Sequence, residues 1–324
     1  AQRHEAHGWD PKGPASIHML RAGVDKDGKV IAWEYKSKGF DQRNVESNES
    51  KPHDNLFSQL TGVKPKPVLY FGLPEESYKF PAKALSFEVI APMLESGSPL
   101  RSSHLRDPVG SNNHFAFESF VDEVAFSLGM DPIDFRLQYI GNERDRELVK
   151  ILAEKSGWQK HTAARKQRRG DVAIGQGVAF VIRGPTRVAM SIEVEVNLKT
   201  GNVWAKRVVV AHDCGVVINP ELLKMTIEGN VCMGLSRALM EEVTFDKSNV
   251  TSVDWATYPI LEMTQKPESV EVVLVNRQNI PPSGAGEGSM RPITAAVANA
   301  IYDATGIRVR QAPFTPDRIK AGMA

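Results

Sequence analysis

Alternating apolar and polar residues predict β-strands in two separate parts of the chain. Residues 17–24 and 30–35 alternate in this way, and residues 25–28 between them have the composition of a tight hairpin turn. Residues 188–198 and 203–211 predict a second hairpin, because apolar side chains fall on one face and polar ones on the other. Further strands are predicted at 87–90, 241–245 and 270–275.

Apolar residues spaced three and four apart predict helices in the middle and near the end of the chain. One such pattern runs from Phe117 to Leu128, with Gly129 as its C-cap. Asp131 followed by Pro132 predicts the capped start of a second helix. Further helices are predicted at 147–155, at 220–239 after Asn219, and at 292–305.

Two glycines, Gly229 and Gly234, interrupt the predicted helix at 220–239. They suggest that another backbone or a ligand approaches that helix closely. Residues 41–79 are polar with scattered proline and glycine, and we expect a long surface excursion there. The basic run at 160–170 is interpreted as a solvated linker in preference to a binding patch.

The fold class predicted from these patterns is α+β, with mixed β-sheets and packed helices. We expect a β-rich section with helices over residues 1–160 and a mixed α/β section over residues 161–324. The chain starts without a Met, a signal peptide or a capped first helix. We therefore expect that it begins in the middle of a longer protein.

Composition and charge narrow the function classes. The net charge is +1 and 24% of the residues are charged, so nothing indicates binding to nucleic acid or to a membrane surface. Only Cys214 and Cys232 occur, without a CxxC pair, which argues against a disulfide framework and against a cysteine-ligated zinc or iron–sulfur site. No apolar stretch approaches the roughly 20 residues of a membrane span.

The densest chemical signal lies at residues 283–289, where Glu287 stands among three glycines just before a predicted helix. Glycines permit backbone angles that other residues avoid and let a bulky ligand come close. A carboxylate near a helix start is favoured in its ionised form, as a general base requires. On this local pattern alone, a glycine-rich turn whose glutamate caps the helix is equally consistent.

Two further clusters suit structural roles better. Arg101, His104 and Arg106 lie in a predicted loop and could grip an anion, although an arginine–aspartate surface network explains them more simply. His212-Asp213-Cys214 invites a hydrolase hypothesis. Adjacent residues of a strand point to opposite faces, however, so the three cannot form a catalytic triad among themselves.

In order, four blocks resemble the large subunit of the xanthine oxidase and aldehyde oxidoreductase family, with the greatest likeness to its bacterial isoquinoline and nicotinate dehydrogenase branch. They span about residues 90–315. The blocks are residues 100–106 with 115–123, residues 131–137, residues 210–215 with 218–220 and 227–230, and residues 284–287 with 298–301 and 304–306.

This resemblance implies a molybdenum–molybdopterin cofactor, in bacteria often in the cytosine dinucleotide form. It implies that Glu287 takes a proton from a hydroxyl on the metal while an N-heteroaromatic compound or an aldehyde is hydroxylated with oxygen from water. Gly284, Ala285 and Gly286 would lie against the cofactor, with Arg101 and Ser102 near the substrate approach. No side chain of this chain is expected to ligate the metal.

The resemblance also implies partners: an upstream half of the molybdopterin subunit, a separate [2Fe–2S] small subunit and a small-molecule substrate. Glycine-rich cofactor motifs that precede the matched region in relatives are missing here, and Gly175-Gln176-Gly177 is interpreted as a strand start instead. We therefore expect the isolated chain to lack the cofactor and to be inactive. The main alternative is a non-catalytic scaffold or assembly module of the same fold that binds no cofactor.

Overall fold

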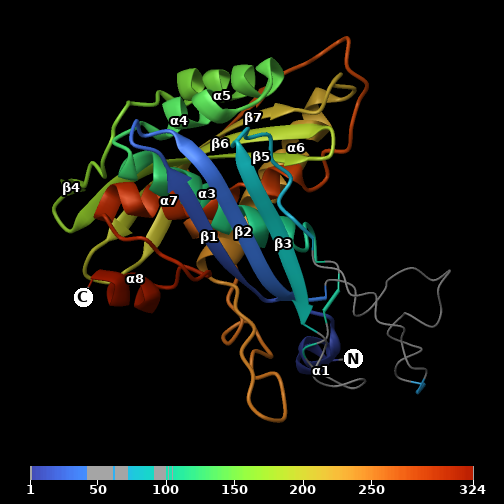
Figure 1. Ribbon diagram of the computed structural model, residues 1–324. Helices are drawn as coiled ribbons and strands as arrows, with labels where there is room; N and C mark the ends of the chain where they lie inside the picture. The colour runs from blue at the N-terminus through green and yellow to red at the C-terminus, as the bar shows by residue number, and fades with distance from the viewer. Residues whose placement is uncertain are drawn as a thin grey trace.

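The structure is a computed structural model that describes residues 2–41, 61–62, 72–90, 100, 102–103 and 105–323. Groups of consecutive strands and groups of consecutive helices follow one another along the chain (Figure 1). In order they are α1 (Arg3–Trp9), β1 (Ser16–Val24), β2 (Val30–Phe40), β3 (Ala82–Ile90), α3 (Gly110–Ser127), α4 (Pro132–Tyr139), α5 (Glu143–Ser156), β4 (Gln167–Arg169), β5 (Val172–Arg183), β6 (Thr186–Asn197), β7 (Val203–Asp213), α6 (Pro220–Leu239), η1 (Met263–Gln265), β8 (Ser269–Leu274), η2 (Gly288–Met290), α7 (Ile293–Thr305) and α8 (Pro316–Met323).

The first sheet is the predicted N-terminal hairpin with one added strand. β1 pairs antiparallel with β2, and β3 then pairs parallel with β2. Gly28 closes the hairpin turn at φ +77°, while Asp25 accepts hydrogen bonds from the backbone of residues 27 and 29. The hairpin prediction is confirmed, and the strand predicted at 87–90 begins five residues earlier.

The second sheet has five strands in the order β4-β5-β6-β7-β8. The predicted hairpin is confirmed as the antiparallel pair β6 and β7, and β8 joins β7 in parallel. Because β5 and β6 alternate between two buried faces, this sheet forms the centre of the fold. On one face it packs against α6 and α7, and on the other against α5. α3 contacts α7 and β5, and the first sheet packs on α3 through β1. The α+β class with mixed sheets is therefore confirmed.

Two glycines of β5 allow α7 to pack directly on the sheet. A Cβ at Gly175 would lie 2.2 Å from the carbonyl oxygen of Ala300, and one at Gly177 would lie 2.2 Å from that of Ala296. Side chains larger than hydrogen would push the helix away from the strand. Gly175 and Gly177 therefore stand inside a strand, where helix packing explains them.

A buried charge cluster ties α3, α4 and β5 together. The Arg136 guanidinium donates to the carboxylate of Glu118 at 2.9 Å and to that of Asp122 at 2.5 Å. Glu118 also accepts from the backbone N–H of Phe180 and from the Tyr78 hydroxyl. Burial by itself lowers the pKa of Arg136, but the two carboxylates raise it overall, so the guanidinium stays charged.

Several predicted boundaries differ from the structure. α3 begins at residue 110 and α5 at residue 143, because polar residues extend both helices before their apolar stripes begin. The strand predicted at 241–245 is wrong: this segment has only an isolated bridge between Phe245 and Val250. α1 and α8 were not predicted, since both are short and mostly polar.

Two segments interpreted as solvent-exposed are partly buried. The excursion predicted at 41–79 lies mainly outside the described residues, but Tyr78 is 1% exposed and packs in the core. In the basic run, Arg165 donates to the buried carboxylate of Asp303 at 2.6 Å, which anchors the run to α7. Among the described residues, none of the helices has the length and apolar character of a membrane span.

Candidate functional site

The glycine-rich segment at 283–289 lies between β8 and α7 and is held at three points. The Ser283 backbone N–H donates to the carbonyl of Cys214 at 2.8 Å, just after β7. The Thr186 hydroxyl, at the start of β6, donates to the carbonyl of Gly284 at 2.8 Å. The Asn230 amide, on α6, donates to the carbonyl of Gly286 at 3.2 Å. The loop is thus fixed by the central sheet and by a helix.

Two glycines of this segment, Gly284 and Gly286, leave its outer side open. None of Gly284, Gly286 and Gly288 has a positive φ, so the expectation that unusual backbone angles require them was wrong. A Cβ built at Gly284 or Gly286 meets no atom within 4 Å. No backbone N–H from Gly284 to Ser289 donates to a carbonyl or side chain within the part of the chain that the structure describes. Free donors on an open glycine backbone suit a bulky ligand with acceptor atoms.

Glu287 is held by a positive charge and a backbone donor. Its Oε2 accepts the backbone N–H of Asp107 at 2.9 Å. Its Oε1 accepts Nε of Arg183 at 2.6 Å and a second donor from the same guanidinium. The Glu287 side chain is 24% exposed and the Arg183 side chain 43% exposed, so the pair is half open to solvent.

These contacts keep Glu287 ionised. Partial burial would raise its pKa, but the Asp107 N–H and the Arg183 guanidinium, with Arg291 further off, lower the pKa below its usual value. The sequence pattern attributes ionisation to the helix that follows. α7 begins only at Ile293, so direct contacts replace that explanation.

A second layer of charge fixes the backbone that holds Glu287. The Arg291 guanidinium donates to the buried Asp107 carboxylate at 2.8 Å, to Glu75 at 3.1 Å and to the Ile182 carbonyl at 2.7 Å. A Cβ at Gly110 would lie 2.4 Å from Nε of Arg291, so glycine is needed beside this pair. The Arg291 guanidinium therefore holds both Asp107, which follows Arg106, and Ile182, which precedes Arg183.

The predicted residues of the loop before α3 are only partly described. Arg101 and His104 lie outside the described residues. Ser102 is 4% exposed and its hydroxyl donates to the carbonyl of Asp41, so it is already engaged within the fold. Arg106 donates to the side-chain oxygen of Asn230 at 3.1 Å, which links this loop to α6. The surface arginine–aspartate network preferred from the sequence is not formed by Arg106, and the aspartate of this loop, Asp107, pairs instead with the distant Arg291 in a buried contact.

His212, Asp213 and Cys214, the residues of the hydrolase hypothesis, do not interact with one another as a catalytic group. Asp213 accepts from Arg144 at 2.5 Å and from Arg277 at 2.6 Å, and these contacts lower its pKa despite burial. Neither ring nitrogen of His212 has a hydrogen-bond partner among the described residues, and burial lowers its pKa to about 4. Burial raises the pKa of the Cys214 thiol. His212 and Asp213 do not hydrogen-bond to each other, and this geometry supports no nucleophilic relay.

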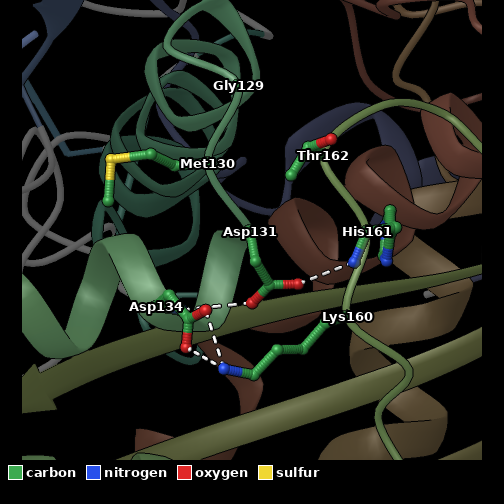
Figure 2. A pocket seen from close by; sticks show the side chains of 7 residues that line it. All are labelled: Gly129, Met130, Asp131, Asp134, Lys160, His161 and Thr162. Carbon is green, nitrogen blue, oxygen red and sulfur yellow. Dashed lines mark hydrogen bonds and ion pairs between the residues drawn. The ribbon is translucent and has the colours of Figure 1, made fainter.

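A shallow surface pocket near the start of α4 is a weaker candidate (Figure 2). Its polar groups already bind one another: Asp131 accepts from Ile133 and His161 backbone N–H groups, and Lys160 pairs with Asp134 at 2.7 Å. The pocket is therefore a capped helix start with a surface ion pair. Across the described residues, no group of three or more His, Cys, Asp or Glu side chains is arranged to hold a metal ion.

The sequence identified Glu287 but missed the residues that hold it. Arg183 closes an apolar strand directly before a Gly-Pro turn, and a lone arginine there was the available signal. Asp107 and Arg291 are 184 residues apart and meet only through tertiary packing.

Comparison with known proteins relates the chain to molybdenum enzymes. Residues 185–267 match a family described as a molybdopterin cofactor-binding domain. A nicotinate dehydrogenase subunit of Pseudomonas putida is 36% identical over 99% of this chain and 27% of that protein. The beta subunit of isoquinoline 1-oxidoreductase from Brevundimonas diminuta is 31% identical over 72% of this chain and 29% of that protein. The chain thus spans under a third of the length of either relative.

Solved structures show the same fold. The aldehyde oxidoreductase of Desulfovibrio gigas superposes with a TM-score of 0.77 at 15% identity, covering 100% of this chain and 50% of that one. Quinoline 2-oxidoreductase of Pseudomonas putida 86 also gives 0.77, at 14% identity, covering 100% and 64%. At these identities the likeness establishes the fold alone, and it is the molybdenum-hydroxylase type that the motifs indicated.

Proposed function

We propose that this chain contributes the general base of a molybdenum hydroxylase. The chain belongs to the xanthine oxidase and aldehyde oxidoreductase family, and it covers a portion of that family's molybdopterin-binding large subunit. The substrate class is N-heteroaromatic compounds or aldehydes, in line with the names of the relatives. The observation that carries the proposal is an ionised, partly exposed Glu287 next to an open glycine backbone.

The residues present fit the cofactor that this family uses. Gly284, Ala285 and Gly286 offer exposed backbone with free N–H donors, where a pterin or its metal-bound sulfur and oxygen atoms could approach without meeting a side chain. When bound, a molybdenum cofactor supplies the two-electron oxidation and an oxygen that originates from water. The cytosine dinucleotide form, the absence of cofactor from the isolated chain and its inactivity there belong to this proposal, as do the partner half and the [2Fe–2S] subunit.

Glu287 has the properties of a positioned proton acceptor. Its Oε2 is aligned by the Asp107 N–H, and its Oε1 is held by Arg183, so both oxygens have a defined direction. During reaction one carboxylate oxygen would take a proton from the attacking hydroxyl group. Arg183 would then stabilise the carboxylate when the proton leaves again. Because Arg183 is itself half exposed, it can shift without disturbing the core.

The test compares wild type with Glu287→Gln, each produced with the remainder of the large subunit and with the iron–sulfur subunit. We expect equal molybdenum content and a loss of turnover of about 100- to 10,000-fold, the usual contribution of a general base. Glu242→Gln, which removes a carboxylate that pairs with Arg318 far along the chain, serves as the matched control. Full activity of Glu287→Gln with molybdenum bound would show that Glu287 is not the base.

A further inference from the structure

α6 has apolar side chains on two opposite faces. Its inner face, with Ile227, Val231 and Leu235, packs into the core beneath the central sheet. At 100° per residue the opposite face carries Leu222, Met225 and Met233, whose exposed fractions are 59%, 64% and 37%. Ile218, just before the helix, is 76% exposed. An apolar stripe on the solvent side of a helix, bordered by polar residues, is typical of a face that another element covers.

Gly229 lies in the middle of this exposed stripe, and the fold gives no reason for it. A Cβ at Gly229 would meet no atom within 4 Å, whereas one at Gly234 would lie 2.3 Å from the side chain of Ile293. Glycine inside a helix is destabilising relative to alanine. Gly234 is therefore explained by internal packing, and Gly229 is suited to the close approach of a backbone from outside.

The stripe is continuous with the site at Glu287. Asn230, the residue after Gly229, donates to Gly286 and to the Ser289 hydroxyl, and Arg237 on the same helix donates to the carbonyl of Arg106. A polypeptide that covered the stripe would thus lie beside the open backbone of Gly284 and Gly286. Charged residues Glu221, Lys224 and Glu228 border the stripe on one side, as at the polar rim of an interface.

We propose that the outer α6 stripe, defined as Ile218, Leu222, Met225, Gly229 and Met233, is the docking surface for the rest of the molybdopterin-binding subunit. This inference rests on the proposed function. The occupant follows from two observations: the chain matches only 27% and 29% of its relatives' subunits, and the open side of the Glu287 loop adjoins the stripe. An apolar segment of the remaining polypeptide lies along the stripe, with its backbone closest at Gly229.

The stripe contains a natural reporter, because Cys232 is exposed on the same side of α6. The unmatched portion of the Pseudomonas putida nicotinate dehydrogenase chain serves as the probe polypeptide. We expect it to bind this chain and to slow alkylation of Cys232 at least tenfold. Light scattering of the chain alone distinguishes a second copy as the occupant: a dimer in which Cys232 is already protected would overturn the proposal.

Three variants separate docking from folding. Met225→Glu should weaken binding at least 100-fold, while Lys224→Glu, an exposed neighbour outside the stripe, should change it less than threefold. Gly229→Ala should raise the melting temperature of the isolated chain yet weaken binding at least tenfold, a combination that a purely structural role would not give. Failure of the wild-type chain to bind, or equal binding by Met225→Glu, refutes the docking surface.

Binding and catalysis are read separately. Glu287→Gln should bind the probe as wild type does, since Glu287 lies outside the stripe. If Met225→Glu abolishes binding but Glu287→Gln proves fully active in the assembled enzyme, the docking surface stands and the proposed base is wrong.

Discussion

His212 offers a quantitative test of how the core responds to acid. The side chain is fully buried, neither ring nitrogen has a hydrogen-bond partner among the described residues, and burial lowers its pKa from 6.5 to about 4, against a small opposing effect of Asp213. In the unfolded chain the imidazole titrates at its usual pKa. Below pH 6.5 the unfolded state therefore binds a proton that the folded state refuses.

The sign and size of the effect follow from this difference. Stability falls as the pH drops from about 6.5 towards 4, and the loss levels off once the folded state is also protonated. At about 1.36 kcal/mol per pH unit the full loss is roughly 3 kcal/mol, of which about 2 kcal/mol appears between pH 7.5 and pH 5. His212→Met, of similar size and without a titrating group, should lose about 2 kcal/mol less over that interval.

The assay is urea unfolding of both proteins at pH 7.5, 6 and 5, with the free energy of unfolding extrapolated to water. His4→Gln, on the exposed surface of α1, is the control and should follow wild type. Carboxylates elsewhere titrate equally in all three proteins, so the difference isolates His212. Parallel loss of stability by wild type and His212→Met would show that the buried imidazole does not resist protonation.

Other consequences concern the charge networks. Arg183→Gln should raise the pKa of Glu287, because the Arg183 guanidinium helps to lower it. The acid limb of the kcat/KM profile should therefore move to higher pH. As a control, Arg207→Gln breaks an ion pair with Glu193 elsewhere in the sheet and should leave the acid limb in place. Arg136→Met should lower the free energy of unfolding by about 3 to 5 kcal/mol, because two buried carboxylates lose their partner. Denaturant titration checks this second prediction, and a cost under about 1 kcal/mol would refute it.

Local patterns predicted the elements whose signals are contained in a few adjacent residues. The β6–β7 hairpin and the start of α4 at Asp131 and Pro132 depend on alternation, turn residues and capping, and all are present. Helices and strands without such signals were either not predicted or predicted wrongly. α1 and α8 lack a long apolar stripe, and the segment at 241–245 begins with two glutamates and forms only an isolated bridge from Phe245 to Val250.

The candidate site divides in the same way. Glu287 was recognisable from its flanking glycines, but the residues that orient it come from distant positions. Arg183, Asp107 and Arg291 meet through the packing of β5, the loop before α3 and the turn between η2 and α7. The spacing of these residues in the sequence does not predict that they lie close together. Tertiary packing also distinguishes Gly229 from Gly234, although both interrupt the same helix: Gly234 makes room for Ile293, whereas Gly229 faces open space.

The most direct test of the central claim is the rate of the first oxidation step in the assembled enzyme. Enzyme holding molybdenum is mixed rapidly with saturating substrate, and reduction of its iron–sulfur clusters is followed by absorbance for wild type and Glu287→Gln. If Glu287 is the base, the single-turnover rate falls about 100-fold or more while substrate still binds. An unchanged single-turnover rate in Glu287→Gln would contradict the account.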